Sequence, residues 1–380
     1  MQLVTKVKRL MPILKWAGGK ENELKHILPH IPNNMERYID PFVGGGAVYF
    51  AIDSQEMWIN DKSVELMNLY RMIKEKNREF FSHLWDIRKD WIALEKIIEN
   101  RLDWLAAVYE NYSAGRYYDA KVNDKITEFI LDIVDDFNGQ LTTSFNIATE
   151  NFIKEIKKNF MNKTKRMKKL EHEKGKLLEK DIKDNLECAL KSAFYMHFRY
   201  LYNNIEEYQI NEGFATAIFY FIREYCYASM FRYNAEGKFN VPYGGISYNR
   251  KDFSKKIRYL ESEEIYKHLD MTNLQNVDFE QFLTEVKPNS NDFIFIDPPY
   301  DSDFSTYVNN AFNKSDQVRL ANYLINQCPA KFMVVIKNTD FIYNLYSNQG
   351  LNLSLFDKKY LVSFQDRNDK NVKHLLIKNY

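Results

Sequence analysis

The chain has 380 residues, of which 45% are hydrophobic and 28% are charged. This composition is ordinary for a globular protein and excludes general disorder, and the length gives room for two or three domains. Lys and Arg number 53 and Asp and Glu number 52, so the net charge is +1. An overall basic coat for nucleic acid is therefore excluded, whereas local basic patches are not.

The cysteines Cys188, Cys226 and Cys328 are far apart in the sequence. Because no CxxC pair and no Cys/His ligand spacing occurs, we expect neither a metal site nor a disulfide framework. No apolar run reaches the length of about 18 residues that a membrane span needs, and the N-terminus lacks the apolar core of a signal peptide. We therefore predict a soluble protein of the cytoplasm without a membrane partner.

The first 77 residues predict a βαβ unit. Residues 37–41 are typical of a short strand, glycines follow at 44–46, and 47–52 read as the apolar start of a helix. A second strand is predicted at 57–60 and a helix at 64–74. Strand, glycine turn, helix and strand in this order are typical of a doubly wound α/β sheet.

The middle of the chain, about 78–210, shows apolar residues at helical spacing and few strand signals. Within it, residues 154–180 hold eleven Lys or Arg against four Glu, a net charge of +7. The pattern predicts a helical hairpin that turns near Gly175 and has a basic outer face. Two interpretations stay open for this face, a solvated helix surface and a contact with nucleic acid.

Strands return near the C-terminus, at 293–296 and 332–336, and segments 360–364 and 374–378 are predicted to pair as a hairpin. We therefore predict an α/β fold with a doubly wound sheet and a helical insertion. The sheet domain is predicted to comprise residues 1–77 and 285–380. The insertion, together with a target-recognition region, is predicted to comprise residues 78–284.

The glycine turn and the acid after the second strand predict a ligand site. Glycines between a strand and a helix let the backbone come close to a ligand. Gly44 and Gly46 fit the start of a GxGxxG pattern, but Tyr49 stands at its third position, which disfavours NAD. Asp61 can accept hydrogen bonds from ribose hydroxyls. Together these residues suggest an adenosine-containing ligand without a pyrophosphate.

The tetrapeptide Asp297-Pro298-Pro299-Tyr300 directly follows the apolar strand 293–296. Two prolines fix φ and expose carbonyls without competing N–H groups. An acid and a carbonyl held in this way can accept from one NH2 group, and the Tyr300 ring can stack on a planar ring. The motif fits a grip on the exocyclic amine of a nucleobase, whereas the structural alternative is a rigid turn with an incidental Tyr.

Five motifs together resemble the DNA adenine methylase (Dam) family of S-adenosylmethionine-dependent DNA N6-adenine methyltransferases, in the alpha motif order. They are LKWAGGK at 14–20, DPFVGGG at 40–46, IND at 59–61, RYNAEGKFNVPYG at 232–244 and DPPY at 297–300. The resemblance covers residues 10–75 and 215–380. It does not cover about 80–210, which is longer and more helical than the family leads us to expect.

The resemblance implies a methyltransferase-type sheet, S-adenosylmethionine as cofactor, double-stranded DNA as partner and roles for particular residues. The catalytic residues it implies are Asp297, Pro298, Pro299 and Tyr300, with Tyr300 stacking on a flipped adenine. The cofactor-binding residues it implies are Trp16, Ala17, Gly18, Lys20, Asp40, Phe42, Gly44, Gly45, Asp61 and Asp297. Whether a companion restriction endonuclease exists, and the oligomeric state, stay open.

The resemblance also implies DNA contacts around a hairpin at about 227–245. Lys15 and Arg232 correspond to base-reading positions, Asn234 lies in the same motif, and Tyr227 corresponds to an aromatic that stacks in the opened duplex. Ala228 and Gly245 depart from the pattern, since members that read GATC carry polar residues there. The departures put the recognition sequence in doubt and leave the chemistry intact.

Three rival functions differ at the motif that begins with Asp297. N4-cytosine methyltransferases tend to carry Ser at this position, and RNA adenine methyltransferases more often carry Asn. A non-catalytic DNA-binding protein derived from a methylase would be expected to lose Asp297, Tyr300 or the glycines, and this chain has them all.

Overall fold

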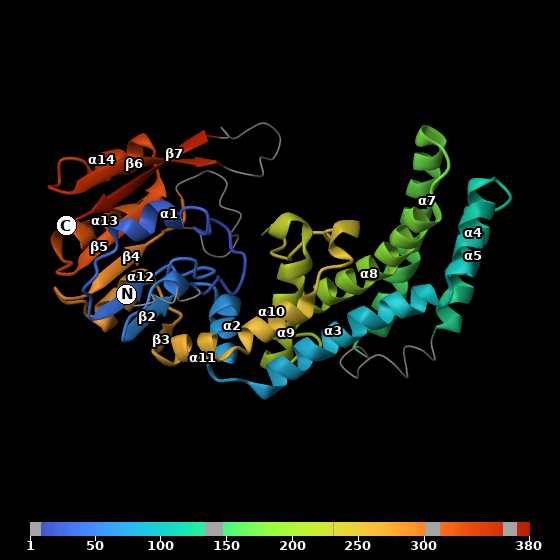
Figure 1. The fold of residues 1–380 in the computed structure, drawn as a ribbon, viewed down its shortest axis with the longest axis horizontal. Helices are drawn as coiled ribbons and strands as arrows, with labels where there is room; N and C mark the ends of the chain where they lie inside the picture. Colours follow the sequence, from blue (N-terminus) through green and yellow to red (C-terminus); the bar gives the residue numbers. More distant parts are fainter. Residues whose placement is uncertain (1–8, 134–146, 231, 301–311, 360–370) are drawn as a thin grey trace, which may run out of the picture. The chain divides into compact units, whose positions relative to one another are not determined.

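The computed structural model describes residues 9–133, 147–230, 232–300, 312–359 and 371–380 (Figure 1). The chain divides into two compact units, Met1–Lys76 with Leu260–Tyr380, and Asn77–Tyr259. We call the first the sheet unit and the second the helical unit. No helix in the described ranges is both long and apolar enough to cross a lipid bilayer.

The sheet unit is built on a seven-stranded sheet with the order β3-β2-β1-β4-β5-β7-β6. Pairs among β1 to β5 are parallel, and β7 runs antiparallel between β5 and β6. The strands are β1 (Arg37–Asp40), β2 (Glu56–Asn60), β3 (Thr272–Gln275), β4 (Phe293–Ile296), β5 (Lys331–Lys337), β6 (Asn352–Lys359) and β7 (Asn371–Lys378). The helices of this unit are α1 (Leu24–Ile27), α2 (Val64–Lys74), α11 (Glu263–Asp270), α12 (Phe279–Val286), α13 (Lys314–Asn326) and α14 (Asp340–Tyr346), with 3₁₀ turns η1 (Leu28–His30) and η2 (Tyr49–Ala51).

Apolar residues on both faces of the strands explain why helices cover both sides of this sheet. Ile39 and Ile294 face the cluster formed by α12, α13 and α14. Their sequence neighbours Tyr38 and Phe293 belong to the opposite face, where their rings lie 6.3 Å apart. The predicted doubly wound α/β class is thus confirmed.

The helical unit contains long helices and two short 3₁₀ turns. They are α3 (Arg78–Glu99), α4 (Leu102–Ser113), α5 (Asp119–Asp132), α7 (Thr149–Lys174), α8 (Glu179–Tyr202), α9 (Glu212–Tyr225), η4 (Tyr227–Ser229), η5 (Ile246–Tyr248) and α10 (Phe253–Leu260), the last of which ends at the unit boundary. Figure 1 shows α7 and α8 running side by side. Gly175, with a φ of +93°, caps the C-terminus of α7, as the predicted helical hairpin requires.

Three sequence-based predictions need correction: a unit boundary, a helix and a strand pairing. The insertion ends at Tyr259 and not at residue 284, because β3 pairs in parallel with β2 and therefore belongs to the sheet. The segment 47–52 forms only the turn η2, since the chain is already extended at Ile52. The partner of 374–378 is 352–356, and the predicted partner 360–364 lies outside the described residues.

Candidate active site and DNA-reading segment

The glycine turn after β1 packs against the segment that contains Trp16. Gly44 has a φ of +50°, and a Cβ at this position would lie 2.9 Å from Trp16 Cδ1. A Cβ on Gly45 would come within 3.0 Å of the Leu14 carbonyl oxygen, closer than real Cβ atoms approach. The glycines therefore let the segment around Trp16 lie against the turn that follows β1, a reason that the sequence interpretation, based on ligand approach alone, did not include.

Two carboxylates lie at the carboxyl ends of β1 and β2. Asp61 accepts hydrogen bonds from the backbone N–H groups of Gly44 (3.1 Å) and Ser63 (2.9 Å), and burial raises its pKa to about 6. Asp40 accepts from the Phe42 N–H (3.0 Å) and the Tyr38 hydroxyl (2.9 Å). Burial raises the pKa of Asp40 to about 8, and the charges of Asp297 and Asp61 add to this effect.

The end of β4 carries a polar cluster around Lys20. The Lys20 side chain is only 2% exposed, and its ammonium forms an ion pair with the Asp297 carboxylate. The same ammonium donates to the Gly18 carbonyl (2.9 Å) and the Tyr300 hydroxyl (3.2 Å). The structure thus joins Lys20, which the resemblance assigned to the cofactor, to two residues of the predicted catalytic motif.

His374 on β7 belongs to this cluster, and sequence reasoning missed it. Its Nε2 lies 3.1 Å from the Tyr300 hydroxyl, and the two rings lie edge to face at 5.6 Å. A lone histidine in a strand-like segment gives no signal of such a long-range contact.

The two prolines after Asp297 use their carbonyls differently. The Pro299 carbonyl accepts a hydrogen bond from the amide of the buried residue Gln317 (2.8 Å). In the described ranges of the chain, no donor contacts the Pro298 carbonyl. The side chain of Gln317 therefore fixes the loop while the carbonyl next to Asp297 keeps its capacity to accept.

The segment 227–245 in the helical unit forms the predicted hairpin. Bridges join Tyr233 to Phe239 and Cys226 to Tyr243. The Asn234 side chain accepts from the N–H groups of Glu236 (3.1 Å) and Lys238 (2.8 Å), so this residue shapes the turn. Arg232 is exposed, and its Nε donates to Asn240 Oδ1 (3.0 Å), which orients the guanidinium.

Tyr227 and the two departures from the family pattern lie at the base of this hairpin. The Tyr227 side chain is 49% exposed although it is large and aromatic. Gly245 has a φ of +86°, a backbone conformation that favours glycine, so a polar side chain there would be strained. Ala228 has a φ of +52°, which is unusual for alanine. Lys15 is exposed in the sheet unit.

The basic helix α7 uses part of its charge internally. Lys165 pairs with Asp119 (2.6 Å), Lys169 pairs with Glu173 (3.7 Å), and Lys168 donates to the Tyr112 carbonyl (2.8 Å). In the described parts of the chain, three basic residues that share one side of the helix by their spacing have no ion pair. This α7 basic group consists of Lys163, Arg166 and Lys174.

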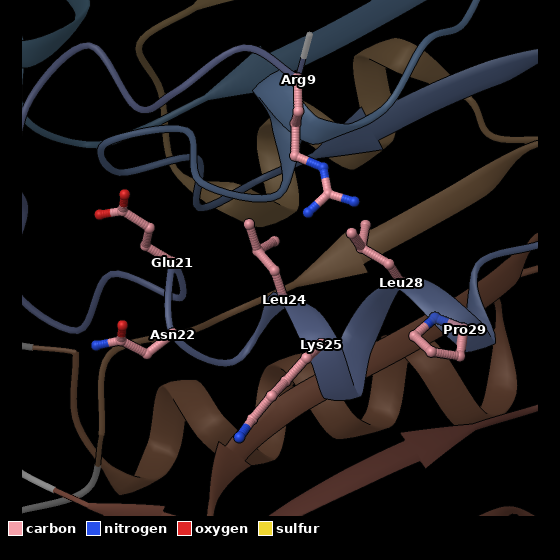
Figure 2. Close-up of a pocket in the computed structure, with 7 residues that line it drawn as sticks. All are labelled: Arg9, Glu21, Asn22, Leu24, Lys25, Leu28 and Pro29. Atoms are coloured by element: carbon pink, nitrogen blue, oxygen red, sulfur yellow. The ribbon is translucent and has the colours of Figure 1, made fainter. Parts of the chain in front are cut away.

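A hollow of about 570 Å³ lies beside α1, at a distance in sequence from the β4 motif (Figure 2). Its lining mixes charged and apolar groups, namely Arg9, Glu21, Asn22, Leu24, Lys25, Leu28 and Pro29. None of the predicted catalytic, cofactor-binding or DNA-binding residues contributes to this lining. Among the residues that the structure describes, no group of three or more His, Cys, Asp and Glu could hold a metal ion.

The strand order, the glycine turn after β1 and the acid-Pro-Pro-Tyr motif after β4 define an α/β protein of methyltransferase type. The family model for the D12 class N6 adenine-specific DNA methyltransferases matches residues 16–193 and 133–363. The chain belongs to this family. It is a site-specific adenine methyltransferase that acts on DNA and uses a methyl donor.

Relatives match along nearly the whole chain. The Type II methyltransferase M.CviBI of Paramecium bursaria Chlorella virus NC1A is 26% identical over 98% of this chain and 100% of its own length. The Type II methyltransferase M.MjaIII of Methanocaldococcus jannaschii is 25% identical over 97% of this chain and 99% of its own. The DNA adenine methylase of Serratia marcescens is 22% identical over 88% of this chain and 85% of its own length.

Proposed function

We propose that the methyl donor is S-adenosylmethionine and that it binds at the carboxyl ends of β1 and β2. The acceptors of Asp61 fit this cofactor. A carboxylate has about four acceptor positions, and Asp61 uses some of them to accept from the N–H groups of Gly44 and Ser63. The rest can accept ribose hydroxyls. The residues proposed to hold the cofactor are Trp16, Ala17, Gly18, Asp40, Phe42, Gly44, Gly45 and Asp61, while Lys20 positions Asp297.

Asp297 and the Pro298 carbonyl are proposed to hold the N6 amine of the target adenine. Adenine's amine is a poor nucleophile because its lone pair is delocalised into the ring. Two acceptors that each take one N–H favour a pyramidal nitrogen and aim its lone pair. When bound, S-adenosylmethionine supplies an electrophilic methyl on a sulfonium. Asp297, held by the Lys20 ammonium, then lies next to the proton that the methylated nitrogen must release.

The adenine must leave the duplex to reach Asp297, which costs a few kcal/mol. We propose that it stacks on the Tyr300 ring, whose hydroxyl is held between Lys20 and His374. A ring fixed at its hydroxyl loses less freedom when the base arrives than a mobile one. The exposed aromatic Tyr227 is the proposed group that fills the gap in the duplex.

Arg232 is the proposed base-reading residue of the hairpin. Because Nε is held by Asn240, its two terminal nitrogens keep their donors for the O6 and N7 atoms of a guanine. Such a bidentate pair contributes about 1–3 kcal/mol of discrimination. Lys15 and Asn234 are proposed as further DNA contacts. We propose that the enzyme acts in the cytoplasm. We also propose a companion restriction endonuclease, which the names of the Type II relatives favour.

The contact between Lys20 and Asp297 carries this proposal, and the variant Asp297→Ala tests it. With labelled S-adenosylmethionine and duplex DNA, we expect single-turnover methylation to fall at least about 100-fold. DNA affinity should stay within about threefold, because phosphate contacts supply most of it. Asp357→Ala, which removes an exposed carboxylate on β6, is the matched control and should leave both quantities unchanged. Normal turnover by Asp297→Ala would refute the assigned role.

A further inference from the structure

A row of polar residues on α8 and its C-terminal cap contacts the chain between 239 and 250. The residues recur every four positions and so share one face of the helix. In order they are Glu187, Lys191, Tyr195, Arg199 and the cap residue Asn203. Glu187 contacts this segment through a side chain, the guanidinium of Arg250 (2.6 Å).

The other members bind main-chain atoms. Lys191, fully buried, donates to the Asn249 carbonyl (2.7 Å). The Tyr195 hydroxyl (3.0 Å) and Arg199 Nη1 (3.2 Å) both donate to the Val241 carbonyl. Main-chain contacts fix where a segment runs without depending on which side chains it carries. The face of α8 therefore fixes the path of the hairpin without engaging the exposed side chain of Arg232.

Asn203 makes the contact nearest to the hairpin tip. Its amide donates to the Phe239 carbonyl (2.9 Å), and its Oδ1 accepts from the Phe239 N–H (2.8 Å). The next residue, Asn240, accepts from Arg232 Nε (3.0 Å) and donates its N–H to the Arg232 carbonyl (3.1 Å). Two short steps thus connect α8 to the guanidinium.

We infer that the α8 row, and Asn203 above all, positions Arg232 for base reading, which makes Asn203 a positioning residue for sequence specificity. This inference rests on the proposed reading of a base by Arg232. It also assigns a role to the helical insertion, in which α8 supports the hairpin at 227–245. A displacement of about 1 Å is enough to spoil a bidentate contact, since such geometry must be held within about 0.5 Å.

The test compares Asn203→Ala with Asn204→Ala. Asn204 is the matched control because its amide donates within its own turn, to the Tyr200 carbonyl (2.7 Å), and makes no hydrogen-bond contact with the hairpin among the residues that the structure describes. Each variant methylates a library of duplexes in which the bases around one adenine are randomised, and sequencing gives the preference at each position. We expect Asn203→Ala to lower discrimination at the base pair read by Arg232 by about threefold or more, whereas Asn204→Ala keeps the wild-type profile. S-adenosylmethionine affinity should not change in either variant.

Two further variants separate the outcomes. Because Asn203→Ala could destabilise the unit, Tyr195→Phe removes one hydroxyl contact to Val241 and conserves the ring, and it should shift the same base preference in the same direction. When Asn203→Ala is added to the Arg232→Ala variant, the preference at that base pair should not change further. If Asn203→Ala and Tyr195→Phe reduce methylation equally at all sequences, the inference is wrong. If Arg232→Ala itself leaves every preference unchanged, the base-reading role of Arg232 fails instead.

Discussion

Replacement of Gly45 by alanine tests the close packing at the glycine turn. Gly45 has no positive φ, so the methyl group acts through space alone. Its Cβ would lie under 3.0 Å from the Leu14 carbonyl oxygen and 3.3 Å from Trp16 Cβ. Since the oxygen belongs to the backbone, the segment around Trp16 must move by roughly half an ångström or more, and overpacking of this kind costs about 1–3 kcal/mol.

The expected result for Gly45→Ala is a loss of both stability and cofactor affinity. Urea unfolding should show about 1–3 kcal/mol of destabilisation, and calorimetric titration should show S-adenosylmethionine binding weakened about tenfold, because Trp16 is displaced. Gly350→Ala is the matched control: its φ is +71° and open space surrounds it, so strain of about 1–2 kcal/mol should lower stability without an effect on cofactor affinity. Equal cofactor affinity in both variants would refute the reasoning.

Three further predictions concern Asp40, Tyr300 and α7. Burial raises the pKa of Asp40 to about 8, from about 4 in the unfolded chain. Between these pH values the native state keeps a proton that the unfolded state loses. Stability therefore falls as the pH rises from about 4 to about 8. Asp40→Asn should flatten this fall in thermal unfolding, and an unchanged slope would contradict the assignment. Tyr300→Phe and His374→Leu should each slow single-turnover methylation about 2–10-fold. The double variant should be no slower than the slower of the two single variants. Additive effects would mean that His374 does not act through the Tyr300 hydroxyl. Glutamine at all three residues of the α7 basic group should weaken binding to all DNA sequences and lower the slope of log affinity against log salt by about 0.9 for each phosphate that the helix no longer neutralises. Glutamine at the acid-paired Lys165 and Lys169 should have a smaller effect. Equal salt slopes in the two variants would mean that the face is only solvated.

The sequence was most informative where local patterns and the final contacts agree. The helix at 64–74 is found as predicted, because Ser63 caps it and its apolar side faces the sheet. The buried strands at 293–296 and 332–336 are also found, with one added residue at each end of the latter. Apolar runs of this kind are typical of strands that are buried on both faces, as in a sheet covered by helices on both sides.

The remaining features depend on contacts between distant residues. β3, with the sequence Thr-Asn-Leu-Gln, is a short polar edge strand that no apolar pattern reveals, and its omission moved the predicted boundary to 285. The catalytic motif was visible, but the joining of Lys20 to Asp297 spans most of the chain. The same holds for His374, which reaches Tyr300 only because β7 inserts beside β5.

Analysis of the methylated base tests the central claim most directly. Duplex DNA treated with the protein and labelled S-adenosylmethionine is digested to nucleosides and separated, with RNA of the same sequence as a parallel substrate. We predict that the label appears as N6-methyladenine in the DNA, at one sequence context. Label in N4-methylcytosine, or in the RNA and not the DNA, would contradict the account.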